Sequence, residues 1–190
     1  VPPLNFPQGK MKSFKTPRVS KDIVGHLHQA RIAEAIYTDT FHTGDHKFPY
    51  AQVFVDRTSR YGDVIPLRSR TEVGSALVTF VCRHFTPLVL VSDNIMENVG
   101  GDLVDQCRAR DIKQVFTCPH HPQMDFAEGY IGRVTTMASF AMVFSGAPLF
   151  MWVWSVKTAV FVNNLMASYF SVQKVWASPY ELLHGEAFPD

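Results

Sequence analysis

The order of apolar and polar positions predicts three neighbouring strands near the start of the folded part of the chain. Residues 35–41 are rich in residues that favour strands, residues 42–49 supply turn residues, and residues 50–67 indicate two further strands. A turn at residues 58–60 separates those two strands. We therefore expect an antiparallel meander of three strands.

The next segments alternate between helix and strand. In residues 69–85 the apolar positions recur every three or four residues, which predicts a helix that packs on one face. Residues 87–93 form a short, almost wholly apolar run, typical of a strand that is covered on both sides and paired in parallel. A second helix over residues 99–110 and a fifth strand over residues 112–118 are expected to follow.

Two long helices, at about residues 126–144 and 149–168, complete the predicted elements. The fold class is then α/β, with a five-stranded mixed sheet of three antiparallel and two parallel strands, and helices on both faces. Residues 1–33 contain four prolines among basic and small polar residues and are expected to be an extended arm or linker. We expect residues 34–170 to form the core and residues 171–190 to extend it.

One stretch of the sequence invites a membrane interpretation. No charged residue lies between Arg133 and Lys157, a gap of 23 residues, which is long enough to cross a bilayer. Gly146 and Pro148 interrupt this run near its middle, and a proline inside a helix costs about 3 kcal/mol. Two helices with a tight connection are the better prediction, and no membrane partner is expected.

Charge and cysteine content say little about the fold, but they bear on the possible partners and on the cellular compartment. The net charge of +1 neither requires nor excludes a nucleic-acid partner. Five lysines and arginines precede the first acid, Asp22, and this run would suit phosphate binding or a solvated linker equally well. Three cysteines without paired spacing argue against a disulfide framework and a cysteine zinc site, and favour an intracellular protein. Because the chain begins with Val, we expect it to be a fragment.

Three acidic residues are candidates for chemistry. Asp93 ends an apolar strand, where ligands of α/β sheets usually bind, although such a residue can also simply cap a turn. Asp39 lies inside a predicted strand, so it either faces solvent or needs a compensating cation. Glu128 follows Asp125 with the spacing of a helix capping box, a structural role that is compatible with metal binding.

Around these acids the sequence resembles the integrase catalytic domain of long-terminal-repeat retroelements, and within that class the copia type. The matching segments, in order, are YTDT (37–40), FVDRTSRYGDVIPLRSRTE (54–72), LVSDN (90–94), PHHPQMDFAE (119–128) and SPYELLHGEAFPD (178–190). Asp93 lies 54 residues after Asp39, and Glu128 lies 35 residues after Asp93, as the resemblance requires. Together the segments span about residues 34–190.

The resemblance implies a ribonuclease H-like fold and a divalent-metal-dependent polynucleotidyl transferase. Two Mg²⁺ or Mn²⁺ ions would bind between Asp39, Asp93 and Glu128. The partners would be DNA, both element ends and target, and further copies of the chain, in the nucleus or in a cytoplasmic particle. The residues expected to contact DNA or to support the site are Arg57, Arg60, Asn94, His120, His121, Gln123 and Arg133.

The sequence also departs from the family pattern near two of the acids. Ile95 stands where the family usually has Gly, and the segment MDFAEGY is one residue shorter than usual and lacks the Arg that follows the glutamate. These departures motivate an alternative, a catalytically inactive or repurposed nucleic-acid-binding module of the same fold. A ribonuclease H-type nuclease that cuts RNA–DNA hybrids is a further alternative, which the long helices after Glu128 disfavour.

Overall fold

The central sheet of the protein is mixed and has the strand order β3-β2-β1-β4-β5. The computed structural model describes residues 31–93, 101–117, 126–171 and 173–189. The strands are β1 (Ala35–His42), β2 (Tyr50–Asp56), β3 (Gly62–Leu67), β4 (Val89–Ser92) and β5 (Lys113–Phe116). β1, β2 and β3 pair antiparallel, whereas β4 pairs parallel with β1 and with β5. The predicted five-stranded mixed sheet is confirmed.

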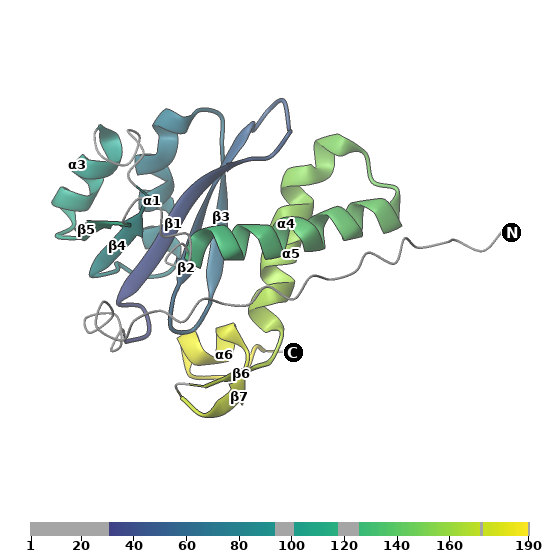
Figure 1. Ribbon diagram of the computed structural model, residues 1–190. Helices are drawn as coiled ribbons and strands as arrows, with labels where there is room; N and C mark the ends of the chain where they lie inside the picture. The colour runs from purple at the N-terminus through teal and green to yellow at the C-terminus, as the bar shows by residue number, and fades with distance from the viewer. Residues whose placement is uncertain (1–30, 94–100, 118–125, 172, 190) are drawn as a thin grey trace, which may run out of the picture.

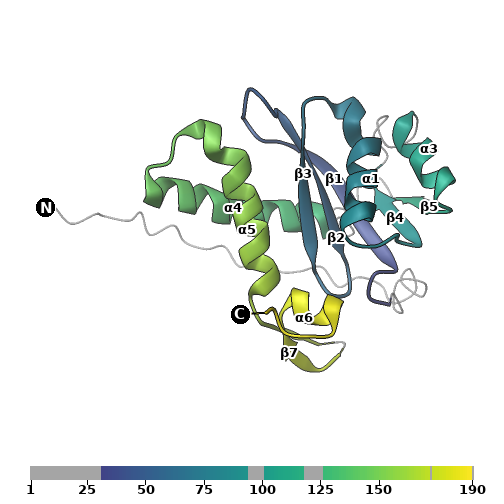
Figure 2. The ribbon, with the colours of Figure 1, turned by 180° about the vertical axis from the view of Figure 1, so that it is seen from behind.

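Helices cover both faces of this sheet (Figures 1 and 2). On one face lie α1 (Val73–Arg83), which a short 3-10 turn at Arg70–Glu72 precedes, and α3 (Asp102–Ala109). On the other lie α4 (Phe126–Ser145) and α5 (Trp152–Leu165), which a second 3-10 turn at Leu149–Met151 joins. The prediction of helices on both faces is therefore correct.

Alternation along β1 sends successive side chains into two separate cores. Ile36 packs with Phe54 and Leu90 against α1 and α3, whereas Tyr37 packs with Val55 and Val91 against α4 and α5. Both cores are built from side chains that are almost fully buried. β1 thus lies at the centre of the molecule, held from both sides.

The predicted connection in the charge-free stretch is also correct. α4 ends at Ser145, and Gly146 follows with a left-handed φ of 64°, a conformation that favours glycine at the end of a helix. The backbone N–H of Ala147 returns to the carbonyl of Met142 at 3.2 Å. Within the described residues, no helix has both the length and the apolar character needed to cross a membrane.

The end of the chain differs from the prediction. The second long helix was expected to reach residue 168, but α5 ends at Leu165, and Ser168 begins a two-stranded ribbon. The ribbon consists of β6 (Ser168–Phe170) and β7 (Val175–Ala177), and α6 (Pro179–His184) follows it. The expected division between core and extension, at residues 170 and 171, would separate two strands that pair, and the domain boundaries stay a prediction.

Candidate active site

Asp39 and Asp93 occupy matching positions on neighbouring parallel strands. β1 and β4 pair with Ala35 opposite Val89 and Tyr37 opposite Val91, a constant offset of 54 residues. The same offset separates Asp39 from Asp93, the residue that directly follows β4. Extending this register by two residues beyond the last pair brings the two acids side by side at the end of the sheet where β4 stops, since adjacent strands lie about 4.8 Å apart.

The side of the sheet on which Asp39 lies is the side that α4 covers. Tyr37 and Phe41, two residues before and after Asp39, both belong to the core that includes α4. Asp39 is only partly exposed, and one of its carboxylate oxygens accepts the backbone N–H of Thr40 at 2.7 Å. The alternative expectation, that Asp39 points freely into solvent, therefore fits this position less well.

Glu128 lies in the first turn of α4, a helix whose first residue contacts β1. The ring of Phe126, at the start of this helix, meets the ring of Tyr37 edge-on, with centroids 5.8 Å apart. Glu128 itself is exposed, and an acid in a first helical turn is favoured by the helix dipole. Asp125, its expected capping partner, lies outside the described residues.

A buried polar network that the sequence reasoning missed supports β1 around Asp39. Gln52 is fully buried on β2, where its side-chain amide donates to the hydroxyl of Thr38 at 2.6 Å. The amide oxygen of Gln52 accepts the hydroxyl of Thr40 at 2.5 Å. The two threonines flank Asp39, so Gln52 fixes the strand on either side of it. The only signal in the sequence was the pair of threonines within YTDT.

The chemistry of these acids suits a hard divalent cation, because carboxylate oxygens are the ligands that Mg²⁺ prefers. A metal site also needs its ligands close together, and the β1–β4 register brings Asp39 and Asp93 to the same end of the sheet. Within residues 31–93, 101–117, 126–171 and 173–189, however, no group of three or more His, Cys, Asp or Glu residues could hold a metal ion. The aspartate pair therefore fits a metal site, whereas Glu128 does not complete it in this arrangement.

The expected DNA-contacting residues fall into three groups. Arg133 is exposed on α4, five residues after Glu128. Arg57 and Arg60 lie in the turn between β2 and β3, at the opposite end of β1 from His42. Asn94, His120, His121 and Gln123 lie outside the described residues.

Both arginines in the turn have contacts within the protein. The guanidinium of Arg57 donates to the hydroxyl of Tyr37 at 3.3 Å, and that of Arg60 lies 4.8 Å from the centre of the Phe170 ring. Each contact leaves part of a charged group able to meet phosphate. Of the three arginines expected to contact DNA, Arg133 alone is on the helix that carries Glu128.

Asp56, within one of the matching segments, closes this turn and lies away from the candidate site. Its carboxylate is 1% exposed and accepts the backbone N–H and the hydroxyl of Ser59, both at 2.7 Å, and the N–H of Ala33 at 3.2 Å. Burial raises the pKa of Asp56, and these hydrogen bonds only partly offset the effect. Asp56 thus has a structural role.

Solved structures match the fold over most of the chain, although no protein-family model and no curated protein sequence matches it. A simian T-cell lymphotropic virus intasome, solved with the PP2A regulatory subunit B56 gamma, matches with a TM-score of 0.70 and 16% identity over 84% of this chain. This chain spans 57% of the length of that one.

The HTLV-2 integrase catalytic core domain in complex with magnesium also matches. Its trimeric form gives a TM-score of 0.64 and 16% identity over 80% of this chain and 97% of that chain. Its dimeric form gives 0.63 and 17% over 80% and 96%. At this identity the likeness concerns the fold alone, and this chain has the ribonuclease H-like fold of retroviral integrase catalytic cores.

Proposed function

We propose that this chain is the catalytic core of an integrase from a copia-type long-terminal-repeat retroelement. Its activities would be trimming of the 3′ ends of element DNA and transfer of those ends into target DNA. The observation that carries the proposal is the register that makes Asp39 and Asp93 neighbours on the α4 side of the sheet. The shared fold with integrase catalytic cores supports it.

Asp39, Asp93 and Glu128 would hold two Mg²⁺ or Mn²⁺ ions. Bound ions would lower the barrier to an in-line displacement at phosphorus by stabilising the attacking and the leaving oxygen. Water as the nucleophile would give end trimming, and a DNA 3′-hydroxyl would give strand transfer. The presence of magnesium in the HTLV-2 core structures is consistent with this preference.

The protein's own residues would position the carboxylates that bind the metal. Gln52 holds the strand around Asp39, so this carboxylate starts from a fixed position. Glu128 is on a different element and is exposed, so completing the site requires it to come closer to the aspartate pair. The site would therefore assemble when metal and DNA bind.

The partners that we propose are element-end DNA and target DNA, together with further copies of the chain. Arg133 would contact phosphates close to the reacting bond, and Arg57 and Arg60 would contact DNA farther away. Asn94, His120, His121 and Gln123 are proposed from the sequence resemblance alone as further DNA contacts. The solved relatives include a dimer, a trimer and an intasome. A nuclear location or a cytoplasmic particle would follow from this role.

A direct test incubates the purified chain with Mn²⁺ and a branched DNA that mimics the product of strand transfer. We expect cleavage and rejoining by the wild type and a loss of at least about 1000-fold in Asp93→Asn, on the scale of losing an essential charge-stabilising group. Asp105→Asn removes an exposed acid on α3 and should retain full activity. No reaction by the folded wild type would exclude the proposed activity.

The second candidate is an inactive or repurposed DNA-binding module of the same fold. Two observations favour it: no group of three metal-binding residues exists among the described residues, and the sequence departs from the family around Glu128. In this case the chain would bind duplex DNA but leave the branched substrate intact. Cleavage of an RNA–DNA hybrid without reaction on duplex DNA would instead point to a ribonuclease H-type enzyme.

A further inference from the structure

The ribbon of β6 and β7 carries two large aromatic side chains on its outer face. In the antiparallel register of the two strands, Tyr169 lies directly opposite Trp176, so their side chains are on the same face. The ring centroids are 5.9 Å apart, and the ring planes are tilted by 50°. Tyr169 is 48% exposed and Trp176 is 73% exposed, and we call these two residues the ribbon pair. The ribbon lies at one end of the molecule, next to α6 and beyond the end of α5 (Figures 1 and 2).

The packing of the ribbon on the rest of the protein does not use the ribbon pair. Side chains alternate along a strand, so Phe170 and Ala177 lie on the opposite face, where they are 2% and 8% exposed. The guanidinium of Arg60, in the turn between β2 and β3, lies 4.8 Å from the centre of the Phe170 ring. A cross-strand pair adds only modestly to the stability of a ribbon. The exposed rings of the ribbon pair are therefore available for a partner.

The charges around the ribbon pair are mostly positive. The sequence has no acidic residue between Glu128 and Glu181, a stretch of 52 residues that includes the whole ribbon. Lys174 is exposed directly before β7, and Arg60 is partly exposed beside the inner face of the ribbon. Glu181, the first acid after the ribbon, accepts the backbone N–H of Ser178 at 2.6 Å within the capping box of α6. A surface of this kind attracts an anionic partner.

Exposed aromatic rings beside cations suit the unpaired bases of a single-stranded nucleic acid. Every base has a flat π face that can stack on an aromatic ring, while lysine and arginine neutralise the phosphates. The bases of a duplex are already stacked on one another, so the rings favour single strands over duplexes. A proline-rich peptide could also pack on aromatic rings, but it would gain nothing from the cations.

We propose that the ribbon pair, Tyr169 and Trp176, is a stacking site for the bases of single-stranded DNA or RNA. Lys174 and Arg60 contact the phosphates of the bound strand. This site goes beyond the proposed strand transfer, because it uses neither a metal ion nor the aspartate pair.

Fluorescence anisotropy of a labelled oligo(dT) of about 12 nucleotides, within the usual size of a single-stranded site, tests this proposal in the presence of EDTA. The purified full chain is expected to bind the oligonucleotide. Trp176→Ala and Tyr169→Ala should each weaken binding by roughly 5- to 150-fold, which is the contribution of one base stacked on an aromatic ring. Trp176→Phe keeps a ring at this position and should retain most of the affinity.

Trp154→Ala is the matched control for Trp176→Ala. Trp154 is 63% exposed on α5, with the ammonium of Lys157 5.5 Å from the centre of its ring, but it lies outside the ribbon. Its replacement should leave binding unchanged. Lys174→Ala should lower the slope of log affinity against log salt by about 0.7, as expected for one phosphate contact to a single strand. The ratio between the wild type and Trp176→Ala should be the same at low and high salt, because stacking releases no counterions.

A second readout does not depend on the alanine variants. Oligo(dT) should quench the tryptophan fluorescence of the wild type through the stacked indole of Trp176, and this quenching should be lost in Trp176→Phe. Urea unfolding checks that each variant is folded, which is expected because the replaced side chains are exposed.

Three outcomes would overturn the proposal. The wild type could fail to bind oligo(dT), and binding of a polyproline peptide that Trp176→Ala abolishes would then assign the ribbon pair to a protein partner. Trp154→Ala could weaken binding as much as Trp176→Ala does. Annealing the oligonucleotide to its complement could leave the loss in Trp176→Ala unchanged, which would exclude stacking on unpaired bases. The assay contains neither a divalent metal nor branched DNA, so failure here and failure of the proposed activity are separate results.

Discussion

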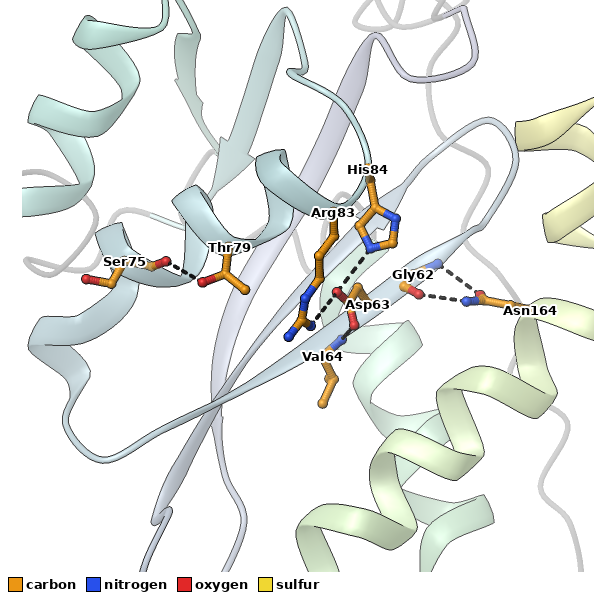
Figure 3. A network of polar contacts seen from close by, with 8 residues as sticks. All are labelled: Gly62, Asp63, Val64, Ser75, Thr79, Arg83, His84 and Asn164. Atoms are coloured by element: carbon orange, nitrogen blue, oxygen red, sulfur yellow. Dashed lines mark hydrogen bonds and ion pairs between the residues drawn. The ribbon is translucent and has the colours of Figure 1, made fainter.

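The side chain of Asn164 on α5 hydrogen-bonds both backbone groups of Gly62, at the first residue of β3 (Figure 3). The N–H of Gly62 donates to Oδ1 of Asn164 at 3.0 Å, and Nδ2 of Asn164 donates to the Gly62 carbonyl at 2.7 Å. Because it pairs with both backbone groups, the Asn164 side chain takes the place of a neighbouring strand here. It is 6% exposed, so water does not compete for these hydrogen bonds. Through this contact α5 is attached to the edge strand of the sheet.

Replacing Asn164 by Asp should destabilise the protein by about 1–3 kcal/mol, because an acceptor would then face the buried carbonyl of Gly62. Urea unfolding at neutral pH measures the change. Thr158→Asp adds the same charge at an exposed position of α5 and should cost little. Equal losses in the two variants would show that charge, rather than the Gly62 contact, is responsible.

Gly62 also makes room for Tyr130 of α4. A Cβ added at Gly62 would lie 2.3 Å from the Tyr130 hydroxyl oxygen and 2.5 Å from Cζ. Gly62→Ala should therefore cost about 1–3 kcal/mol, and Tyr130→Phe should relieve only part of this in a double-mutant cycle. Gly129→Ala, on α4, meets no atom within 4 Å and should raise stability by up to about 1 kcal/mol. Similar responses from Gly62→Ala and Gly129→Ala would contradict the close contact.

Asp63, beside Gly62, gives the stability a dependence on acid pH. Burial alone would raise the pKa of Asp63, but hydrogen bonds from His84 at 3.1 Å and Val64 N–H at 2.7 Å, with Arg83 nearby, lower it below its usual 3.8 (Figure 3). A lowered folded-state pKa means stability that is present above 3.8 and lost as the pH falls through the folded value. The stability difference between the wild type and Asp63→Asn should thus shrink in this acid range. A difference that is constant with pH would rule out this linkage.

The order of the main elements could be predicted because each has a strong local signal. β4 lies in an almost wholly apolar run, and α1 repeats apolar residues at helical spacing. The ribbon of β6 and β7 was missed because strands of three residues are too short to show alternation. α6 did carry a readable signal, since Ser178 and Glu181 form a capping box and Gly185 ends the helix in the left-handed conformation.

The candidate site could be predicted only in part. Its three acids were selected from their positions in predicted elements and from the resemblance to integrase catalytic domains. The offset that places Asp39 beside Asp93, in contrast, is a property of strand pairing between segments far apart in the chain. The role of Gln52 depends on the same long-range pairing, which places it between Thr38 and Thr40. Local pattern does not contain this information.

The two described cysteines should differ sharply in reactivity. Cys107 is 1% exposed in the core, and burial raises the pKa of its thiol to about 11, whereas Cys82 is exposed on α1. Since the thiolate is the reactive form, iodoacetamide should modify Cys82 in the native protein and Cys107 only after unfolding in urea. Peptide mass spectrometry after timed alkylation measures both rates. Fast native modification of Cys107 would mean that α3 opens readily.

The aspartate pair should make folding stability sensitive to divalent cations, whether or not the chain cleaves DNA. Like charges on neighbouring strands repel, and a cation that binds the folded form relieves this and raises the unfolding midpoint. At Mn²⁺ concentrations of about 100 times the dissociation constant, the wild type should gain about 2.7 kcal/mol. Asp39→Asn and Asp93→Asn should each lose most of this gain, and Asp105→Asn, on the exposed side of α3, should keep it. Calorimetric unfolding with and without Mn²⁺ measures the effect. If Mn²⁺ stabilised all three variants as much as the wild type, the cation would bind elsewhere, and the register that unites Asp39 with Asp93 would have no role in holding it.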